Sequence, residues 1–180
     1  TVTSNRRGTP FWEAAGRQGI RSVVMHVPVT FPAADYAGGG RLLSGLGVPD
    51  VRGRIGTPSF YTSDPFFAPR NKNEFSVELV RLESNKGTIR SEVFGPYNKL
   101  FKEPPVVKVP MTLTVAPDGG SLTIEPEGSP AVTLKPGEWS DWVLFTFRFN
   151  SIVKLSGIGR FHLAALAPEV NLYLSPIHFN

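Results

Sequence analysis

The strongest constraint on the fold is the alternation of apolar and polar residues in the last 110 positions of the chain. One face of an extended run is formed by Val107, Val109, Met111, Leu113 and Val115. The residues Asp118-Gly119-Gly120 then predict a hairpin turn that joins this run to the next one. Further short runs follow over 122–124, 132–134, 143–149, 161–165 and 170–174. Strands at this spacing, separated by glycine and proline turns, predict an antiparallel β-sandwich or barrel.

One of these runs is apolar on both faces. Val143, Phe145 and Phe147 alternate with Trp142 and Leu144. A strand that is covered on both faces lies inside a sheet, so this run is predicted to be a central strand.

The first 27 residues have a different pattern, which predicts a helix followed by a strand. Thr9 can cap the helix, Pro10 suits the first helical position, and Gly19 can end the helix in a left-handed conformation. Residues 22–27 then form a nearly unbroken apolar run, typical of a parallel strand covered on both faces. One such strand makes no stable sheet, so its partners are expected outside this chain.

Residues 28–70 are rich in proline and glycine and predict a long irregular connection. The predicted organisation is a helix–strand fragment of an α/β sheet with this connection over 1–70, and an inserted antiparallel β-sandwich over 71–180. The fold class is mainly β, of the α+β type.

The net charge of +4 resides entirely in the first 70 residues, which hold eight arginines, no lysine and four acidic residues. The guanidinium fork suits phosphate and carboxylate groups. Arg41, Arg52 and Arg54 surround a glycine-rich stretch and are the candidate contacts for an anion, or for an interface between domains. They could equally tie down the loop by pairing with main-chain carbonyls.

Composition excludes several classes of function. The chain has no cysteine, which removes disulfides, thiolate metal sites and cysteine nucleophiles. No block of like charges is interleaved with aromatic residues in the manner of a nucleic-acid-binding module, and no apolar run approaches the length of a membrane span.

A search for catalytic motifs finds none. The three histidines form no H-x-H or H-x-x-x-H pair, and the acidic residues of the first 70 positions have no metal-ligand spacing. In the glycine-rich stretch, Leu46-Gly47 stands where a phosphate-binding loop needs Lys-Ser/Thr. The sequence therefore predicts no catalytic, cofactor-binding or metal-binding residue in this chain.

The tryptophans are predicted to pack in the core. Trp139 and Trp142 are three apart in an extended context, so they are expected to point to opposite faces, with at most one in any surface patch.

Three segments of the first 62 residues resemble a known family. The first runs from Thr9-Pro10-Phe11-Trp12 through Val27-Pro28-Val29-Thr30-Phe31-Pro32. The second is Gly40-Arg41-Leu42-Leu43-Ser44-Gly45-Leu46-Gly47-Val48-Pro49-Asp50-Val51-Arg52-Gly53, and the third is Gly56-Thr57-Pro58-Ser59-Phe60-Tyr61-Thr62. They resemble bacterial members of the type I phosphodiesterase/nucleotide pyrophosphatase family, of the alkaline phosphatase superfamily. The end of the chain, Leu172-Tyr173-Leu174-Ser175-Pro176-Ile177, is similar to the end of the β-rich insertion of that family, and the resemblance over the sandwich is looser.

The resemblance implies that the chain is a portion of a larger hydrolase. Such enzymes use a Thr or Ser nucleophile and two divalent metal ions, usually zinc, held by aspartates and histidines. Their nucleophile and first aspartate would precede Thr1 and their other ligands would follow Asn180, so no catalytic residue is carried onto this sequence. The insertion would cap or wall the substrate cleft, and the partners would be the remaining catalytic domain and a phosphodiester or nucleotide substrate. A periplasmic or extracytoplasmic parent is one option, and the compartment stays open.

Two alternatives remain. The chain could be a free-standing β-sandwich module that binds a glycan or a protein, or a small hydrolase that uses His26 with Ser44 or Asp50. The unpaired strand is also expected to favour self-association, because unpaired edges are templates for pairing.

Overall fold

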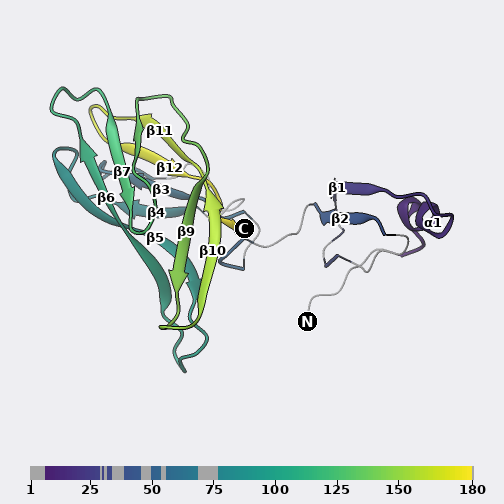
Figure 1. The fold of residues 1–180 in the computed structure, drawn as a ribbon. Helices are drawn as coiled ribbons and strands as arrows, with labels where there is room; N and C mark the ends of the chain where they lie inside the picture. The colour runs from purple at the N-terminus through teal and green to yellow at the C-terminus, as the bar shows by residue number, and fades with distance from the viewer. Residues whose placement is uncertain are drawn as a thin grey trace. The chain divides into compact units, whose positions relative to one another are not determined.

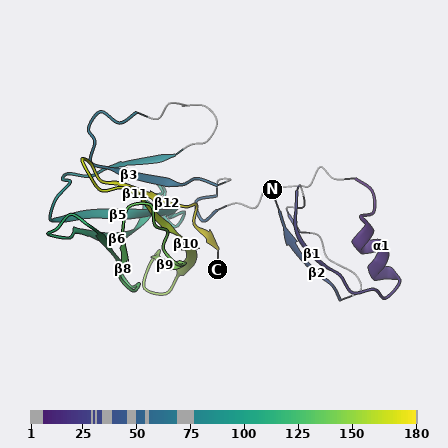
Figure 2. The ribbon, with the colours of Figure 1, turned by 90° about the horizontal axis from the view of Figure 1, so that it is seen from above.

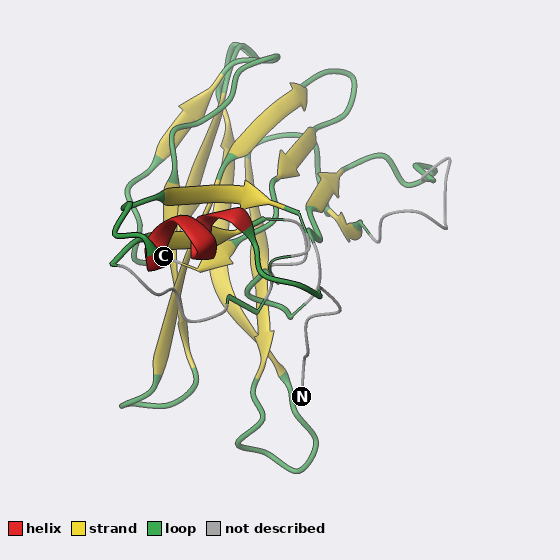
Figure 3. Cartoon of the chain, turned by 90° about the vertical axis from the view of Figure 1, so that its right-hand side faces the viewer, coloured by secondary structure: helices red, strands yellow, loops and turns green. Residues whose placement is uncertain are grey.

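A computed structural model describes residues 7–28, 30, 32–33, 39–45, 50–53, 56–68 and 77–179, without the side chain of His26. The chain divides into two compact units, Thr1–Val48 and Pro49–Asn180. Strands dominate the described residues and α1 is their only helix (Figure 3). The prediction of a mainly β, α+β fold is confirmed.

In the first unit, helix α1 spans Phe11–Arg17. Pro10 is the N-cap residue, so the helix begins one residue later than predicted. No side chain caps it, and the expected cap from Thr9 is wrong. The end of the helix is as predicted, because Gly19 has a φ of +77° and the Ile20 amide donates to the Ala15 carbonyl at 3.0 Å.

The predicted strand after the helix is β1 (Val23–Val27), which pairs in parallel with β2 (Arg41–Ser44). Its partner strand therefore lies within this chain, and the expectation that β1 is unpaired is wrong. The expectation of an irregular segment from 28 to 70 is also wrong in part, since β2 and β3 (Ser59–Thr62) lie within it.

The β1–β2 sheet buries one face and exposes the other. Val24 is buried, whereas Val23 and Met25 on the opposite face are 72% and 59% exposed, and Leu43, the register partner of Met25, is 51% exposed. The sequence predicts a strand that is covered on both faces, and the described residues of the first unit cover only one of them.

The second unit starts before the predicted boundary at residue 70. Val51 is buried in its core, and β3 pairs with strand β12 (Asn171–Leu174) at the other end of the sequence. The boundary between the two units therefore follows residue 48, because the segment around β3 is part of the sandwich.

The described residues of the second unit form three sheets. The first has the order β5-β6-β7-β8, the second β11-β12-β3-β4 and the third β13-β10-β9. Their other strands are β4 (Glu78–Arg81), β5 (Thr88–Tyr97), β6 (Val106–Val115), β7 (Leu122–Pro126), β8 (Val132–Leu134), β9 (Val143–Arg148), β10 (Lys154–Gly159), β11 (Phe161–Ala165) and β13 (His178–Phe179). All pairs are antiparallel except β3–β4, which is parallel.

One hydrophobic core holds these sheets together. In the view from above, the layer with β3, β11 and β12 faces the layer with β5 and β6, and β9 and β10 lie at one end (Figures 1 and 2). Tyr61, Leu113, Phe147 and Leu172 represent the three sheets in the core, and each is 0% exposed. The predicted sandwich architecture is therefore what these residues form.

The predicted hairpin at Asp118-Gly119-Gly120 joins β6 to β7, with Gly119 at a φ of +69°. The prediction for β9 is wrong in one respect. β9 ends its sheet in the described part of the chain, with β10 as its partner, and Trp142 and Leu144 are 60% and 44% exposed. Apolar residues on both faces of this run therefore do not mark a central strand.

None of the helices described here is both long and apolar enough to cross a membrane.

Candidate functional site

Of the three candidate arginines, Arg52 is built into the second unit. Its side chain is 7% exposed, and its guanidinium pairs with the Glu78 carboxylate at 2.9 Å and lies 6.0 Å from the ring centre of Phe94. Its Nε and Nη1 are buried, and no described residue gives them a hydrogen-bond partner. Arg52 therefore fastens the segment before β3 to strand β4, the loop-anchoring role left open by the sequence.

Arg41 lies in the first unit, at the exposed start of β2. Together with Arg21 it lines a hollow of about 260 Å³, with Gly39 and Gly40 on its rim. Two guanidinium groups beside main-chain glycines could hold an anion. Arg54 lies outside the described residues.

Asp50 and Ser44 are both used structurally, which bears on the small-hydrolase alternative. The buried Asp50 carboxylate accepts hydrogen bonds from the amides of Arg52 and Thr57 at 2.9 and 2.8 Å. The Ser44 hydroxyl donates to the Thr30 carbonyl at 2.9 Å. The side chain of His26 lies outside the description.

The second unit has a surface cluster of aromatic and basic side chains. The sequence predicts two of its members on opposite faces and gives no role to the other three. We call it the Trp–Arg cluster, and it consists of Trp139, Trp142, Arg160, His162 and Tyr173. The Arg160 guanidinium carbon lies 5.6 Å from the Trp139 ring centre and 5.8 Å from that of Trp142. The indoles are 49% and 60% exposed. Both tryptophans therefore share one surface patch, contrary to prediction.

Strand geometry explains that error. Only residue 139 makes a bridge, to His162, and β9 begins at residue 143, so strand alternation does not run from Trp139 to Trp142. Trp12, by contrast, is buried at 6% exposure, as predicted.

The cluster is held in place by several contacts. The Trp139 indole stacks on the His162 ring at 4.7 Å, and its edge contacts Tyr173 at 5.8 Å. The Arg160 Nε donates to the Ser140 carbonyl at 2.7 Å, and the described residues offer its Nη atoms no hydrogen bond. Burial raises the pKa of the Tyr173 phenol above its ordinary value. The arrangement presents two half-exposed indoles beside a guanidinium fork, which suits a ligand with a flat face and a carboxylate or phosphate.

The cluster continues across the outer face of the second sheet. His162 pairs with Tyr173, Tyr173 with Phe60, and Phe60 with Leu79, so one residue of each strand lies in a single transverse row. Phe67 stacks on Phe60 at 4.8 Å. The end of this row forms an apolar hollow of about 160 Å³, lined by Phe60, Phe67, Val77, Leu79 and Tyr173.

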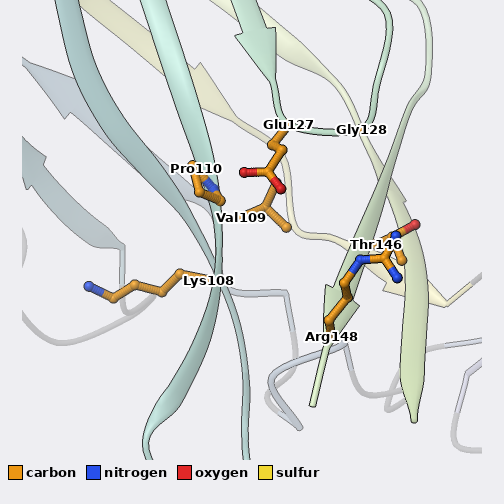
Figure 4. A pocket seen from close by; sticks show the side chains of 7 residues that line it. All are labelled: Lys108, Val109, Pro110, Glu127, Gly128, Thr146 and Arg148. Carbon is orange, nitrogen blue, oxygen red and sulfur yellow. The ribbon is translucent and has the colours of Figure 1, made fainter. Parts of the chain in front are cut away.

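A second hollow, of about 140 Å³, is lined by strand β6, by strand β9 and by the turn between β7 and β8 (Figure 4). Glu127 and Arg148 line it, whereas Lys108 extends away from both of them (Figure 4). Lys108 instead pairs with Glu92 at 2.5 Å. The lining of this hollow thus holds one acidic side chain and two basic ones, and among the described residues no hydrogen bond joins a nucleophile to any of them.

The described residues contain no group of three or more histidine or acidic side chains that could hold a metal ion. The resemblance places the ligands of the two-metal centre outside this chain, and no reaction step through a metal is derived for it.

Sequence reasoning missed Arg160, His162 and Tyr173. The alternation of β11 and β12 carries a signal for the last two, because His162 and Tyr173 fall on the face opposite to the buried Leu163 and Leu172. Nothing in the sequence pairs Arg160 with two indoles, since that contact depends on the path of residues 139–142.

Searches of protein-family models, curated proteins and solved structures found no match to this chain.

Proposed function

We propose that this chain is the non-catalytic insert-bearing portion of a metal-dependent phosphodiesterase or nucleotide pyrophosphatase, in which the second unit shapes the substrate cleft. The proposal rests on the resemblance of residues 9–62 and on one structural observation: the parallel β1–β2 sheet with an open apolar face.

Parallel sheets occur almost only where helices or other layers cover both faces. A two-stranded sheet alone is marginally stable. Here Val23, Met25 and Leu43 form an apolar row that the described residues leave exposed. The remaining catalytic domain of such a hydrolase would cover this row and extend the sheet.

The packing of residues 50–62 supports a structural role for the second unit. The Val51 amide donates to the Ile177 carbonyl at 2.9 Å, and Arg52 pairs with Glu78. The segment of the resemblance that follows β2 is thus fixed to the sandwich, which could hold the insertion as a wall beside the cleft. Zinc and the nucleophile would come from polypeptide outside this chain.

Activity measurements test the proposal. We expect the product of the complete reading frame to hydrolyse a chromogenic phosphodiester with added zinc and to lose activity with a chelator. We expect the 180-residue chain to show no turnover under the same conditions. Turnover by the short chain, or an inactive product of the complete reading frame, would contradict the proposal.

Substitutions in the product of the complete reading frame can assign a role to each candidate arginine. Arg41→Ala lowers kcat/KM if Arg41 faces the anionic groups of the substrate, whereas Arg52→Ala lowers the melting temperature first, because Arg52 is buried against Glu78. Unchanged kcat/KM and melting temperature in both variants and in Arg54→Ala would remove these residues from the proposal.

The Trp–Arg cluster favours a second candidate function, a binding module for an acidic glycan. The exposed indoles could stack on sugar rings while Arg160 binds a carboxylate. Binding of an oligosaccharide of uronic acid, measured by calorimetry, should disappear in Trp142→Ala and in Arg160→Met. Phe66→Ala is the matched control, since Phe66 is 90% exposed outside the cluster. Equal binding by all these variants would exclude this candidate.

A further inference from the structure

The end of the second unit that carries the β5–β6 and β9–β10 loops exposes large apolar side chains. Leu100 and Phe101 in the first loop are 64% and 58% exposed, and Ile152 and Val153 in the second are 88% and 46% exposed. Figure 1 shows both loops at the lower end of the second unit. We call this end the tip, residues 97–105 and 148–154.

The two loops of the tip are tied together and ordered by asparagines. Asn98 is 4% exposed, and its side-chain amide donates to the Phe149 carbonyl of the other loop at 3.0 Å. The Asn98 side-chain oxygen accepts from the Leu100 amide at 3.2 Å. Asn150 does the same in its own loop, accepting from the amides of Ile152 and Val153 at 2.8 and 2.6 Å. The apolar side chains are thus presented by closed turns.

Positive charge surrounds these apolar side chains. Lys99, Lys102, Arg148 and Lys154 lie in the tip against a single acid, Glu103. None of the four basic side chains forms an ion pair with a described residue. The second unit as a whole has no such excess, because residues 71–180 hold eleven basic and eleven acidic residues.

We propose that the tip binds an anionic lipid membrane at its surface. Apolar side chains at the ends of the loops would enter the boundary between headgroups and acyl chains, while the lysines would lie among anionic headgroups. An exposed apolar group alone fits many partners. The lysines around it favour a partner with an anionic surface and an apolar interior. A lipid bilayer with anionic headgroups has both properties. The proposal is independent of the hydrolase proposal.

Sedimentation of the 180-residue chain with vesicles tests this inference. We expect binding to vesicles of phosphatidylcholine with 30 mol% phosphatidylserine (roughly physiological for an anionic leaflet) and little binding to phosphatidylcholine alone. Binding should weaken as the salt concentration rises.

Two sets of substitutions separate the contributions. Replacing Lys99, Lys102 and Lys154 with glutamine should weaken binding about five-fold for each lysine. The double variant Phe101→Ser, Ile152→Ser should weaken it about ten-fold or more. All these side chains are exposed, and an unchanged melting temperature will show that the fold is retained.

Matched controls lie elsewhere in the second unit. Phe66→Ser removes an apolar side chain that is 90% exposed, and Lys86→Gln with Lys135→Gln removes exposed charge outside the tip. These variants should bind like the wild type.

Four results would overturn the proposal. They are no binding to the anionic vesicles, equal loss in the control variants, loss with the lysine variants only, and a concentration-dependent dimer that the tip variants abolish without vesicle binding. The third would show an electrostatic contact without insertion, and the fourth a second copy of the chain as the occupant.

Discussion

At the scale of single residues, Arg52 shows how much a buried charge depends on one partner. Its side chain is 7% exposed, and its Nε and Nη1 have no hydrogen-bond partner among the described residues. Glu78 is the carboxylate that the described residues place against its charge. Glu78, at 31% side-chain exposure, keeps access to water. The two ends of this ion pair are therefore unequal, because an uncompensated buried charge is costly and a hydrated one is not.

This asymmetry predicts unequal effects of substitution. Glu78→Gln should lower the free energy of unfolding by about 2–3 kcal/mol, since it removes the counter-charge that the described residues supply to the buried Arg52. Arg52→Met should change it by about 1 kcal/mol or less, because it also removes two unsatisfied donors. Urea denaturation of both variants measures the difference. A larger loss in Arg52→Met would contradict this account of the pair.

Tyr61 links pH to stability. It is fully buried, and burial raises the pKa of its phenol above the ordinary value of 10.0. Its hydroxyl donates to the Glu92 carbonyl at 3.0 Å, which joins β3 to β5. The folded state therefore retains a proton that the unfolded chain loses above pH 10.0.

We expect full stability from this group below about pH 10 and a loss of about 1.4 kcal/mol per pH unit above it. Tyr61→Phe should cost about 1 kcal/mol at neutral pH through the lost hydrogen bond and should flatten the alkaline decline. Chemical denaturation between pH 8 and about 11.5 checks both effects. An alkaline slope that is the same in the variant would show that Tyr61 does not cause it.

At the scale of elements, alternation predicted the strands whose core positions are filled by large apolar residues. The runs around β6, β7, β9, β11 and β12 are of this kind. β5 and β10 gave a weaker pattern because glycines occupy core-facing positions in them. Gly95 is buried against the Phe147 ring, and Gly157 against Ile177 and Val51. The space beside each glycine is filled by an apolar side chain from another segment of the chain. The apolar residue that marks this core position is therefore found in that segment and not in β5 or β10.

Gly95 tests this interpretation of the sheet contact. A Cβ there would overlap the Phe147 ring and lie 2.8 Å from the Val107 carbonyl oxygen. Gly95→Ala should therefore destabilise the chain by about 3 kcal/mol, the upper end for overpacking. Gly120→Ala is the control, because its nearest neighbour is the side chain of Asp118 at 3.3 Å in an exposed turn. Thermal unfolding compares them, and equal melting temperatures would contradict the packing of β5 against β9.

At the scale of the whole molecule, the sequence predicted the class of fold and little of the surface. The Trp–Arg cluster and the tip depend on where loops end in space, which alternation does not encode. The sequence also does not reveal which segments cover a strand. The apolar pattern of β1 indicates two covered faces, and the described residues cover one. That difference supports the central proposal, that the first unit completes its sheet with other polypeptide.

Hydrogen exchange of the backbone amides tests this claim most directly. In the 180-residue chain, we expect the amides of Val23–Val27 to exchange near the rate of an unfolded peptide, while those of Val106–Val115 stay protected. In the product of the complete reading frame, protection of Val23–Val27 should rise by about a hundred-fold or more, at any protein concentration. Equal protection of Val23–Val27 in the two proteins would contradict the claim, because the first unit would then be stable without further cover.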